Sequence, residues 1–217
     1  MESKSLKMPI VGEAIPLLFL GLLLAAVSFF VGWKMTGGII PLLTLGVALF
    51  FRNPERSIPQ DEKAILSPAD GKVVRIERSF SEKRFPEKVV LLSIFLSLTN
   101  VHVNRLPVSG YIKEVTYRKG KFHFAFDSNA MAENERNFLV IATEGGREVG
   151  FAQVAGFIAR RIRCFVKVGD KVSAGERFGL IRFGSRMDLF LPASVEILVR
   201  EGEKVQGGET LLARFKS

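Results

Sequence analysis

The chain has 217 residues, which is enough for one compact domain and a short appendage but leaves little room for two full domains. Its single cysteine, Cys164, excludes an internal disulfide and a cysteine metal cluster, so no metal site is predicted and a buried small hydrophobic side chain is the simpler interpretation. Although 24% of the residues are charged, 47% are hydrophobic, which indicates that the apolar residues are concentrated in one part of the chain.

That part is the N-terminus. Residues 14–33 contain no charged side chain, and at about 1.5 Å per residue a helix of this length crosses a hydrocarbon core of about 30 Å. A second uncharged run covers residues 35–51. Because Gly37, Gly38 and Pro41 interrupt it, its clean helical part has only about ten residues, against about 20 for a full span. The sequence predicts a membrane anchor over residues 1–52, either a transmembrane helical hairpin or a spanning helix with a re-entrant second arm.

Basic residues flank this anchor on both sides. Lys4 and Lys7 precede it, and Arg52, Arg56 and Lys63 follow it. Since positive charge favours the cytoplasmic side, we expect both ends in the cytoplasm, with the body of the protein facing the cytoplasm from the cell membrane. A signal peptide is the alternative, but two consecutive apolar runs exceed the apolar core of an ordinary signal peptide.

The formal net charge of +9 indicates an anionic partner, for which a lipid surface and a nucleic acid are the obvious candidates. The apolar segments favour lipid. Basic residues are spread through segments 118–121 and 160–163 and include Lys167, but they follow no zinc-finger, RRM or helix-turn-helix pattern. No nucleic-acid partner is therefore predicted.

After residue 51 the chain changes to short β-branched runs separated by Gly, Pro, Asp and Asn, a pattern typical of many short strands. The expected strands are residues 89–96, 110–117, 138–143, 148–154, 161–168, 179–183 and 195–200. Residues 130–137 are the one helical or turn-like candidate. The body, residues 53–217, is therefore predicted to be mainly β.

An internal repeat lies near the C-terminus. Residues 169–176 (GDKVSAGE) and 202–209 (GEKVQGGE) both read Gly, acid, Lys, Val, two variable residues, Gly, Glu. Each copy predicts a polar turn whose glycines supply positive φ, followed by an apolar strand at 178–181 or 211–215. Segment 67–73 has a related sequence. Such paired half-motifs resemble the two halves of biotinyl/lipoyl-type domains, so the predicted fold is a flattened barrel-sandwich.

The segment expected to join the two halves as a hairpin is 182–188. A biotin or lipoyl carrier needs a modifiable lysine there, and this segment has none, which disfavours a carrier domain. It contains the Gly184–Ser185 bond instead. Since Gly184 lacks a Cβ, its carbonyl is unhindered, and Ser185 Oγ can attack it if a base and an oxyanion-stabilising group assist. Elimination of the resulting ester and hydrolysis would leave a pyruvoyl group, although a Gly-Ser pair alone is an ordinary turn sequence.

A stronger signal comes from a set of segments in fixed order along nearly the whole chain. They are 50–54 (FFRNP) with Arg56 and Pro59, 67–73 (SPADGKV), 100–110 (NVHVNRLPVSG), 133–136 (ENER), 156–162 (GFIARRI) and 183–192 (FGSRMDLFLP). This set resembles the short form of the phosphatidylserine decarboxylase family, with 183–192 at the position of the processing site.

The resemblance implies autocatalytic cleavage between Gly184 and Ser185, which gives a β chain, 1–184, and an α chain, 185–217, that remain associated. Ser185 would become the covalent pyruvoyl cofactor. Asp70 and Ser185 match the Asp and Ser that the family uses for self-cleavage, and His102 matches the histidine associated with decarboxylation. Long-form members have a second histidine where this chain has Arg105, which leaves the base for self-cleavage open; His102 is a candidate for both steps.

Physical chemistry favours His102 over the other histidine. An imidazole titrates near neutral pH and can carry a proton, whereas Arg105 stays protonated and suits contact with a phosphate or carboxylate. His123 lies between Phe122 and Phe124 and is better interpreted as a packed strand residue.

The implied reaction is the decarboxylation of phosphatidylserine to phosphatidylethanolamine at the membrane surface, with the pyruvoyl group as electron sink and His102 as proton donor. Two alternatives stay open. One is a non-enzymatic, membrane-anchored barrel-sandwich adaptor, for which Ser185→Ala would change nothing. The other is a decarboxylase of a related serine-headed lipid.

Overall fold

The computed structural model describes residues 8–120, 134–156, 162–181 and 185–216. The chain divides into two compact units, Met1–Glu55 and Arg56–Ser217. Several parts of the predictions lie outside the described ranges: Lys4, Lys7, His123 with its neighbours Phe122 and Phe124, residues 130–133 with Glu133, residues 157–161, and residues 182–184 with Gly184.

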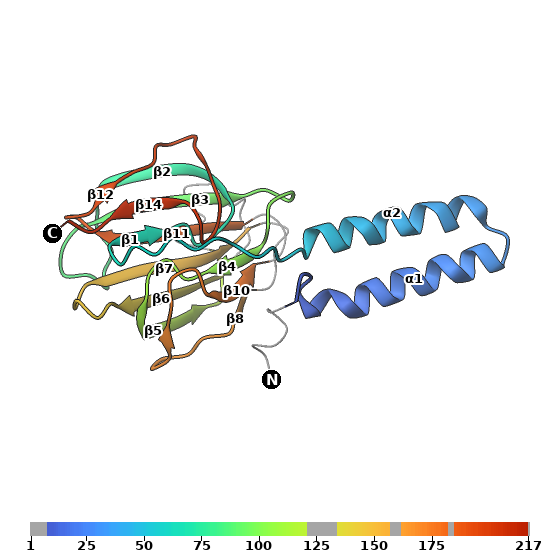
Figure 1. Cartoon of the computed structure of the whole chain (residues 1–217), viewed down its shortest axis with the longest axis horizontal. Helices are drawn as coiled ribbons and strands as arrows, with labels where there is room; N and C mark the ends of the chain where they lie inside the picture. The colour runs from blue at the N-terminus through green and yellow to red at the C-terminus, as the bar shows by residue number, and fades with distance from the viewer. Residues whose placement is uncertain (1–7, 121–133, 157–161, 182–184, 217) are drawn as a thin grey trace. The chain divides into compact units, whose positions relative to one another are not determined.

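The first unit is a pair of antiparallel helices (Figure 1). A short 3-10 turn, η2 (Gly12–Ala14), leads into α1 (Ile15–Phe30), and a turn through Gly32, with φ 86°, leads into α2 (Lys34–Phe50). The two ends of the unit are tied together by an isolated bridge between Ile10 and Arg52 and by the Asn53 N–H, which donates to the Pro9 carbonyl at 2.7 Å.

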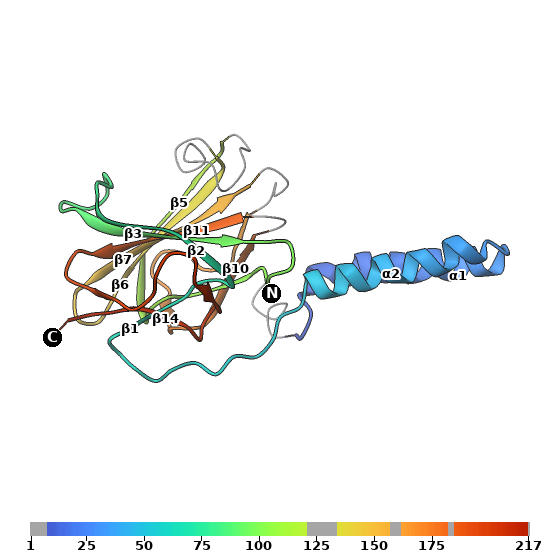
Figure 2. The ribbon, with the colours of Figure 1, turned by 90° about the horizontal axis from the view of Figure 1, so that it is seen from above.

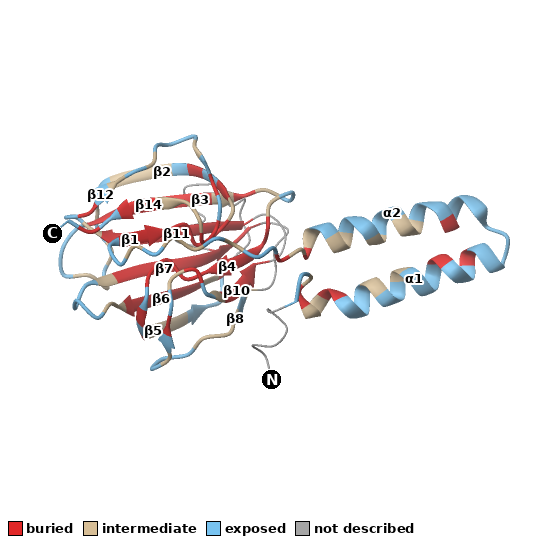
Figure 3. Cartoon of the chain, viewed as in Figure 1, coloured by how far each residue is buried: buried red, intermediate tan, exposed pale blue. Residues whose placement is uncertain are grey.

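The predicted interruption of the second helix is wrong. α2 continues through Gly38 and Pro41 for 17 residues. Pro41 removes only the hydrogen bond to the Gly37 carbonyl, and Gly37 has no side chain, so the Phe29 ring of α1 packs directly against it. By length and composition, Gly12–Phe30 is the one described helix able to cross a membrane, and α2 is shorter. Large apolar side chains are exposed along both helices (Figure 3).

The second unit is built from strands. In chain order they are β1 (Ala64–Leu66), β2 (Gly71–Phe80), β3 (Val89–Leu96), β4 (Val103–Arg105), β5 (Gly110–Arg118), β6 (Arg136–Ala142), β7 (Glu148–Ala155), β8 (Ile162–Cys164), β9 (Lys171–Val172), β10 (Arg177–Ile181), β11 (Ser185–Pro192), β12 (Glu196–Ile197), β13 (Lys204–Val205) and β14 (Leu211–Arg214).

One large antiparallel sheet has the order β13-β2-β3-β11-β7-β6-β5-β9. It curls, and two small sheets, β1-β14-β12 and β4-β10-β8, lie against one of its faces (Figure 2). The main core fills the space between them and includes alternate residues of β3 and β11, such as Leu92, Ile94, Met187 and Leu189. The intervening residues face a second cluster around Phe138 and Phe190. The central strands are therefore buried on both faces (Figure 3).

The mainly β prediction is confirmed, and several strands match closely. The predicted 89–96 is β3, and 110–117, 138–143 and 148–154 correspond to β5, β6 and β7. The predicted strands 161–168 and 195–200 shrink to β8 and β12. The turn-like prediction for 130–137 is wrong at its end, because Arg136 and Asn137 begin β6. The strands β2 and β11 are not among the predicted ones.

The repeat occupies the two opposite edges of the large sheet. β9 of the first copy pairs with β5, and β13 of the second copy pairs with β2. Each copy has positive φ at its first and second conserved glycines: 91° and 76° at Gly169 and Gly175, 90° and 81° at Gly202 and Gly208. The predicted role of these glycines in turns is confirmed.

Candidate active site

Ser185 is the first residue of the central strand β11, not part of a hairpin tip as predicted. It pairs with Leu96 of β3 on one side and Ala155 of β7 on the other. The residue is 0% exposed, and its Oγ has no hydrogen-bond partner among the residues that the structure describes. The hairpin prediction failed because Ser185 to Asp188 contain polar side chains that the sheet buries. A buried hydroxyl without a partner costs about 1–3 kcal/mol, so the Ser185 hydroxyl does not stabilise the fold.

The alternation of β11 separates its polar side chains onto two faces. Ser185 lies on the core face with Met187, and Arg186 and Asp188 lie on the opposite face. Arg186 Nε and Nη2 contact the two oxygens of Asp188 at 2.9 and 3.0 Å. Both residues are buried, at 6% and 0% exposed. This pairing holds the charged side chains away from the face that carries Ser185.

His102 lies directly before β4, a strand of the small sheet β4-β10-β8. Its side chain is buried, and its carbonyl accepts a hydrogen bond from the Ile181 N–H at 3.3 Å. Ile181 is the last residue described before 182–184, and Ser185 is the first after it. Since four residues span at most about 14 Å, His102 is anchored near the chain segment that leads to Ser185.

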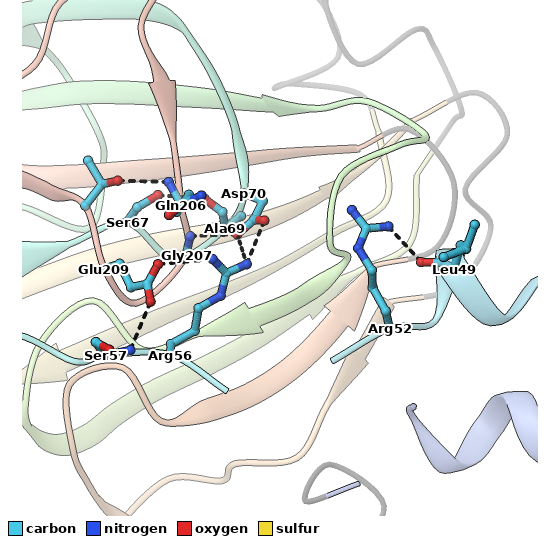
Figure 4. Close-up of polar contacts among 11 residues, drawn as sticks. Leu49, Arg52, Arg56, Ser57, Ser67, Ala69, Asp70, Gln206, Gly207 and Glu209 are labelled. Carbon is cyan, nitrogen blue, oxygen red and sulfur yellow. Dashed lines mark hydrogen bonds and ion pairs between the residues drawn. The ribbon is translucent and has the colours of Figure 1, made fainter. Parts of the chain in front are cut away.

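Asp70 is held in a polar network, shown in Figure 4. Arg56 Nη2 donates to both carboxylate oxygens at 3.0 and 2.8 Å, and the Gly207 N–H donates to Oδ1 at 2.8 Å. Arg56 Nη1 also donates to Glu209 at 3.2 Å. The Ser57 N–H lowers the pKa of Glu209, and Arg56 acts in the same direction, against the effect of burial. The hydrogen bonds described for Asp70 therefore go to Arg56 and Gly207.

The sheet register places Asp70 at the same end of the molecule as Ser185. Lys72 pairs with Phe95, so Gly71, one residue earlier, lies level with Leu96, the partner of Ser185. Two strand spacings of about 4.8 Å put the Gly71 backbone about 10 Å from Ser185. Asp70 and Ser185 are thus brought to one end of the sheet, and no described hydrogen bond joins their side chains directly.

Arg105 lies close to the network around Asp70. Its Nη1 donates to the Gly175 carbonyl at 2.9 Å, and a Cβ on Gly208 would lie 2.7 Å from its Cδ. Its charge also contributes to the lowered pKa of Glu209. The side chain of Arg105 is buried in the protein. Its contact with a phosphate or carboxylate stays a prediction.

The matched segment 133–136 reaches the strand beside Ser185. Asn134 Nδ2 donates to the Ala155 carbonyl at 2.8 Å, and the Ala155 N–H donates to the Glu135 carbonyl at 2.9 Å. Since Ala155 is the β7 partner of Ser185, this segment fixes the backbone next to the serine.

Sequence reasoning missed three buried amides on the core side. Asn137 Nδ2 donates to Gln153 Oε1 at 3.1 Å, and Gln153 Nε2 donates to Asn104 Oδ1 at 2.9 Å. A lone glutamine within the apolar run 149–155 was the available signal. Cys164 lies close by; it is half-buried, not fully buried as predicted, and packs against the apolar core, and burial raises the pKa of its thiol.

The structure thus buries Ser185 at one end of a curled antiparallel sheet and buries His102 next to β4, and both are residue types that take part in acyl-transfer and proton-transfer chemistry. Among the described residues, no group of three or more His, Cys, Asp or Glu side chains could hold a metal ion.

Comparison with known proteins identifies the family. Residues 43–213 match the family described as phosphatidylserine decarboxylase. Proteins named phosphatidylserine decarboxylase proenzyme are similar over most of the chain. That of Geotalea uraniireducens is 44% identical over 204 residues, covering 94% of this chain and 95% of its own. That of Syntrophus aciditrophicus is 48% identical over 178 residues, covering 82% of this chain and 84% of its own. That of Desulfotalea psychrophila is 39% identical over 209 residues, covering 96% of this chain and 98% of its own. The chain belongs to the phosphatidylserine decarboxylase family.

Proposed function

We propose that this protein decarboxylates phosphatidylserine to phosphatidylethanolamine with a pyruvoyl group that it makes from its own Ser185. Family membership supports the reaction, and the name proenzyme, shared by the relatives, supports processing of the chain. The structural observation that carries the proposal is the Ser185 hydroxyl, which is fully buried and has no partner among the described residues.

The surroundings of Ser185 fit a prosthetic group that is formed from the residue itself. A pyruvoyl group at residue 185 would supply a carbonyl that accepts the electron pair left by departing CO2. The protein's part is to hold that residue still. β11 is paired on both sides, to β3 and β7, so the new N-terminus would remain fixed in the sheet after cleavage.

The same pairing explains why the two chains, 1–184 and 185–217, would stay together. The α chain would contribute β11, β13 and β14, which pair with β3, β7, β2 and β1 of the β chain. Leu189, Leu191 and Leu212 are fully buried in the shared core. Separation of the chains would expose this apolar surface to water.

We assign His102 to proton delivery at the substrate carbon and Asp70 to self-cleavage. The burial of His102 keeps its imidazole out of bulk water, and an imidazole can give and take a proton near neutral pH. Arg56 holds the Asp70 carboxylate at the Ser185 end of the sheet. The base that takes the Ser185 proton is left open between these groups.

The first unit would bring the site to its substrate. We propose that residues 1–52 anchor the chain in the cell membrane, with residues 53–217 facing the cytoplasm as the catalytic domain. The apolar helix Gly12–Phe30 supports membrane association. For the body, the equivalent edge strands of the two repeat copies support a relationship to biotinyl/lipoyl barrel-sandwiches.

Denaturing mass analysis tests the proposal. The wild-type protein should yield two chains, with the 185–217 chain lacking an N-terminal amine, and should release CO2 from phosphatidylserine in mixed micelles. Ser185→Ala should stay as one chain and release none. Ser93→Ala is the matched control, because Ser93 is also buried but lies on the opposite face of the neighbouring strand, beside Asp188. A wild-type chain that is never cut, or an α chain with an ordinary amine, would refute the proposal.

A further inference from the structure

Three buried amide side chains form a line through the core of the second unit. Asn137 on β6, Gln153 on β7 and Asn104 on β4 are between 0% and 2% exposed. The line runs from Asn137 through Gln153 to Asn104, with donor to acceptor distances of 3.1 and 2.9 Å. It crosses from the large sheet to a small one. At its end, Asn104 Nδ2 has no hydrogen-bond partner within the described ranges of the chain.

A backbone carbonyl determines which amide atoms donate and which accept along this line of side chains. Gln153 Nε2 also lies 3.3 Å from the Arg163 carbonyl oxygen, which can only accept. The nitrogen of Gln153 must therefore point toward Arg163 and Asn104. Because Gln153 donates, Asn104 must present its oxygen to Gln153, which leaves the Asn104 N–H2 group free to donate elsewhere.

The free donor lies on the side of the molecule that carries the site. Gln153 is opposite Met187, and Ala155, two residues on, is opposite Ser185. Gln153 and Ser185 are thus diagonal neighbours on one sheet face, roughly 7–8 Å apart between their Cα atoms. Asn104 lies in the middle of β4 (Val103–Arg105), two residues after His102.

We propose that Asn104 Nδ2 is the hydrogen-bond donor that stabilises the oxyanion of self-cleavage; this inference rests on the proposed function. In that step Ser185 Oγ loses its proton to a base and forms a bond to the Gly184 carbonyl carbon, and the carbonyl electron pair moves onto the oxygen. The C–N bond then breaks, the nitrogen takes a proton, and an ester remains. The Asn104 amide lowers the energy of the oxygen while it is negative.

A neutral amide suits this task better than a charged group. It needs no counter-ion in the core, and it neither gains nor loses a proton at the pH of the reaction. Its side chain is pre-oriented because Gln153 holds its oxygen and Arg163 holds Gln153. Preorganisation of this kind is what makes an oxyanion donor effective.

Asn104→Asp is the test, because it keeps the oxygen that Gln153 contacts and replaces the N–H2 donor by a titratable oxygen. As a carboxylate it cannot donate, and loss of one oxyanion donor should slow cleavage by about 100-fold. When the introduced carboxylate is protonated, it has an O–H donor again. The uncut Asn104→Asp precursor is purified in detergent at pH 8 and shifted stepwise to pH 5. Its rate of self-cleavage should rise as the pH falls.

The matched comparison is the Asp70→Asn precursor, which should also be slow but should not recover in acid. Gln153→Glu gives a second test: its carboxylate only accepts, so it turns the Asn104 amide toward itself, and cleavage should slow although Asn104 is intact. Circular dichroism establishes that each variant is folded.

The assignment would be overturned if folded Asn104→Asp or Gln153→Glu cleaved at the wild-type rate. It would also be overturned if acid did not speed cleavage of Asn104→Asp. If the wild-type chain itself is not cut before Ser185, the proposed function fails as well, so the two failures are distinct.

Discussion

The two edges of the large sheet are built alike but carry different chemistry. At one edge the turn 106–112 packs against repeat copy 169–176, and at the other the turn 67–73 packs against copy 202–209; we call these the Ser109 edge and the Asp70 edge. Their hydrogen bonds correspond. The Gly175 N–H donates to the Leu106 carbonyl and the Gly208 N–H to the Ser67 carbonyl, both at 2.8 Å. The two turns also exchange backbone hydrogen bonds, from Arg105 to Pro68 and from Leu66 to Pro107.

One difference between the edges lies at residues 109 and 70. Ser109 Oγ accepts the Ala174 N–H at 2.9 Å, and at the equivalent place Asp70 Oδ1 accepts the Gly207 N–H at 2.8 Å. A hydroxyl is therefore sufficient for the turn. The negative charge and second oxygen of Asp70 are surplus to the fold, and they are held by Arg56. The hydrogen bond from Gly207 is therefore a structural feature that both edges share, whereas the carboxylate of Asp70 is the group that our proposal assigns to self-cleavage.

The largest effect is expected when the Asp70 edge is given the side chain of the Ser109 edge. Asp70→Ser keeps an acceptor for Gly207 and removes the charge, so the protein should fold while self-cleavage slows by about 100-fold or more. The rate is measured by denaturing gels after a pulse of synthesis. Ser109→Ala is the mirror control: it should lose about 1 kcal/mol of stability and cut normally. Equal cleavage by Asp70→Ser and wild type would make Asp70 a turn residue alone.

Removing the partner of Asp70 should have the largest effect on stability. The Arg56 and Asp70 side chains are 9% and 14% exposed, so Arg56→Met leaves a nearly buried charge unpaired and should cost about 3 kcal/mol. Adding Asp70→Ser should recover most of that loss. Both are measured by chemical denaturation in a Ser185→Ala background, which keeps the chain intact. A double variant no more stable than Arg56→Met would mean that Arg56 acts mainly through Glu209.

The edge turns could be predicted from the sequence because their signal is local. The repeat's spacing gave the turns and the positive φ at Gly169 and Gly202. The partners of the site residues could not be predicted, since Asp70 meets Gly207 across 137 residues and Gln153 meets Asn104 across 49. β11 was missed for a related reason: its polar residues find partners or a function only when neighbouring strands enclose them.

The glycines of the two repeat copies should respond alike to substitution where their surroundings are alike. Gly169 and Gly202 have φ values of 91° and 90°, and a Cβ on either would meet no heavy atom within 3.8 Å. Alanine at either should therefore cost only the left-handed backbone penalty, about 1–2 kcal/mol. At Gly175 and Gly208 a Cβ would also lie 2.5 and 3.1 Å from Ile58 Cδ1, so the cost should be larger. Denaturation midpoints measure all four; unequal costs at Gly169 and Gly202 would contradict equivalent turns.

The smallest expected difference between the edges is a dependence on pH. Glu176 accepts the Ser173 N–H of its own turn, whereas the equivalent Glu209 accepts the Ser57 N–H and contacts Arg56. The Ser57 hydrogen bond holds the pKa of Glu209 below its ordinary value of 4.5.

Because the folded pKa of Glu209 is the lower one, the stability that it contributes is present above the unfolded pKa and is lost as the pH falls through the folded pKa. Between about pH 5 and pH 3 the free energy of unfolding should therefore fall less steeply in Glu209→Gln than in its parent, the intact Ser185→Ala chain. Urea denaturation at each pH measures the two slopes. Parallel slopes would mean that the Ser57 contact does not persist in solution, and the Asp70 edge would then owe its distinct electrostatics to Arg56 and Asp70 alone.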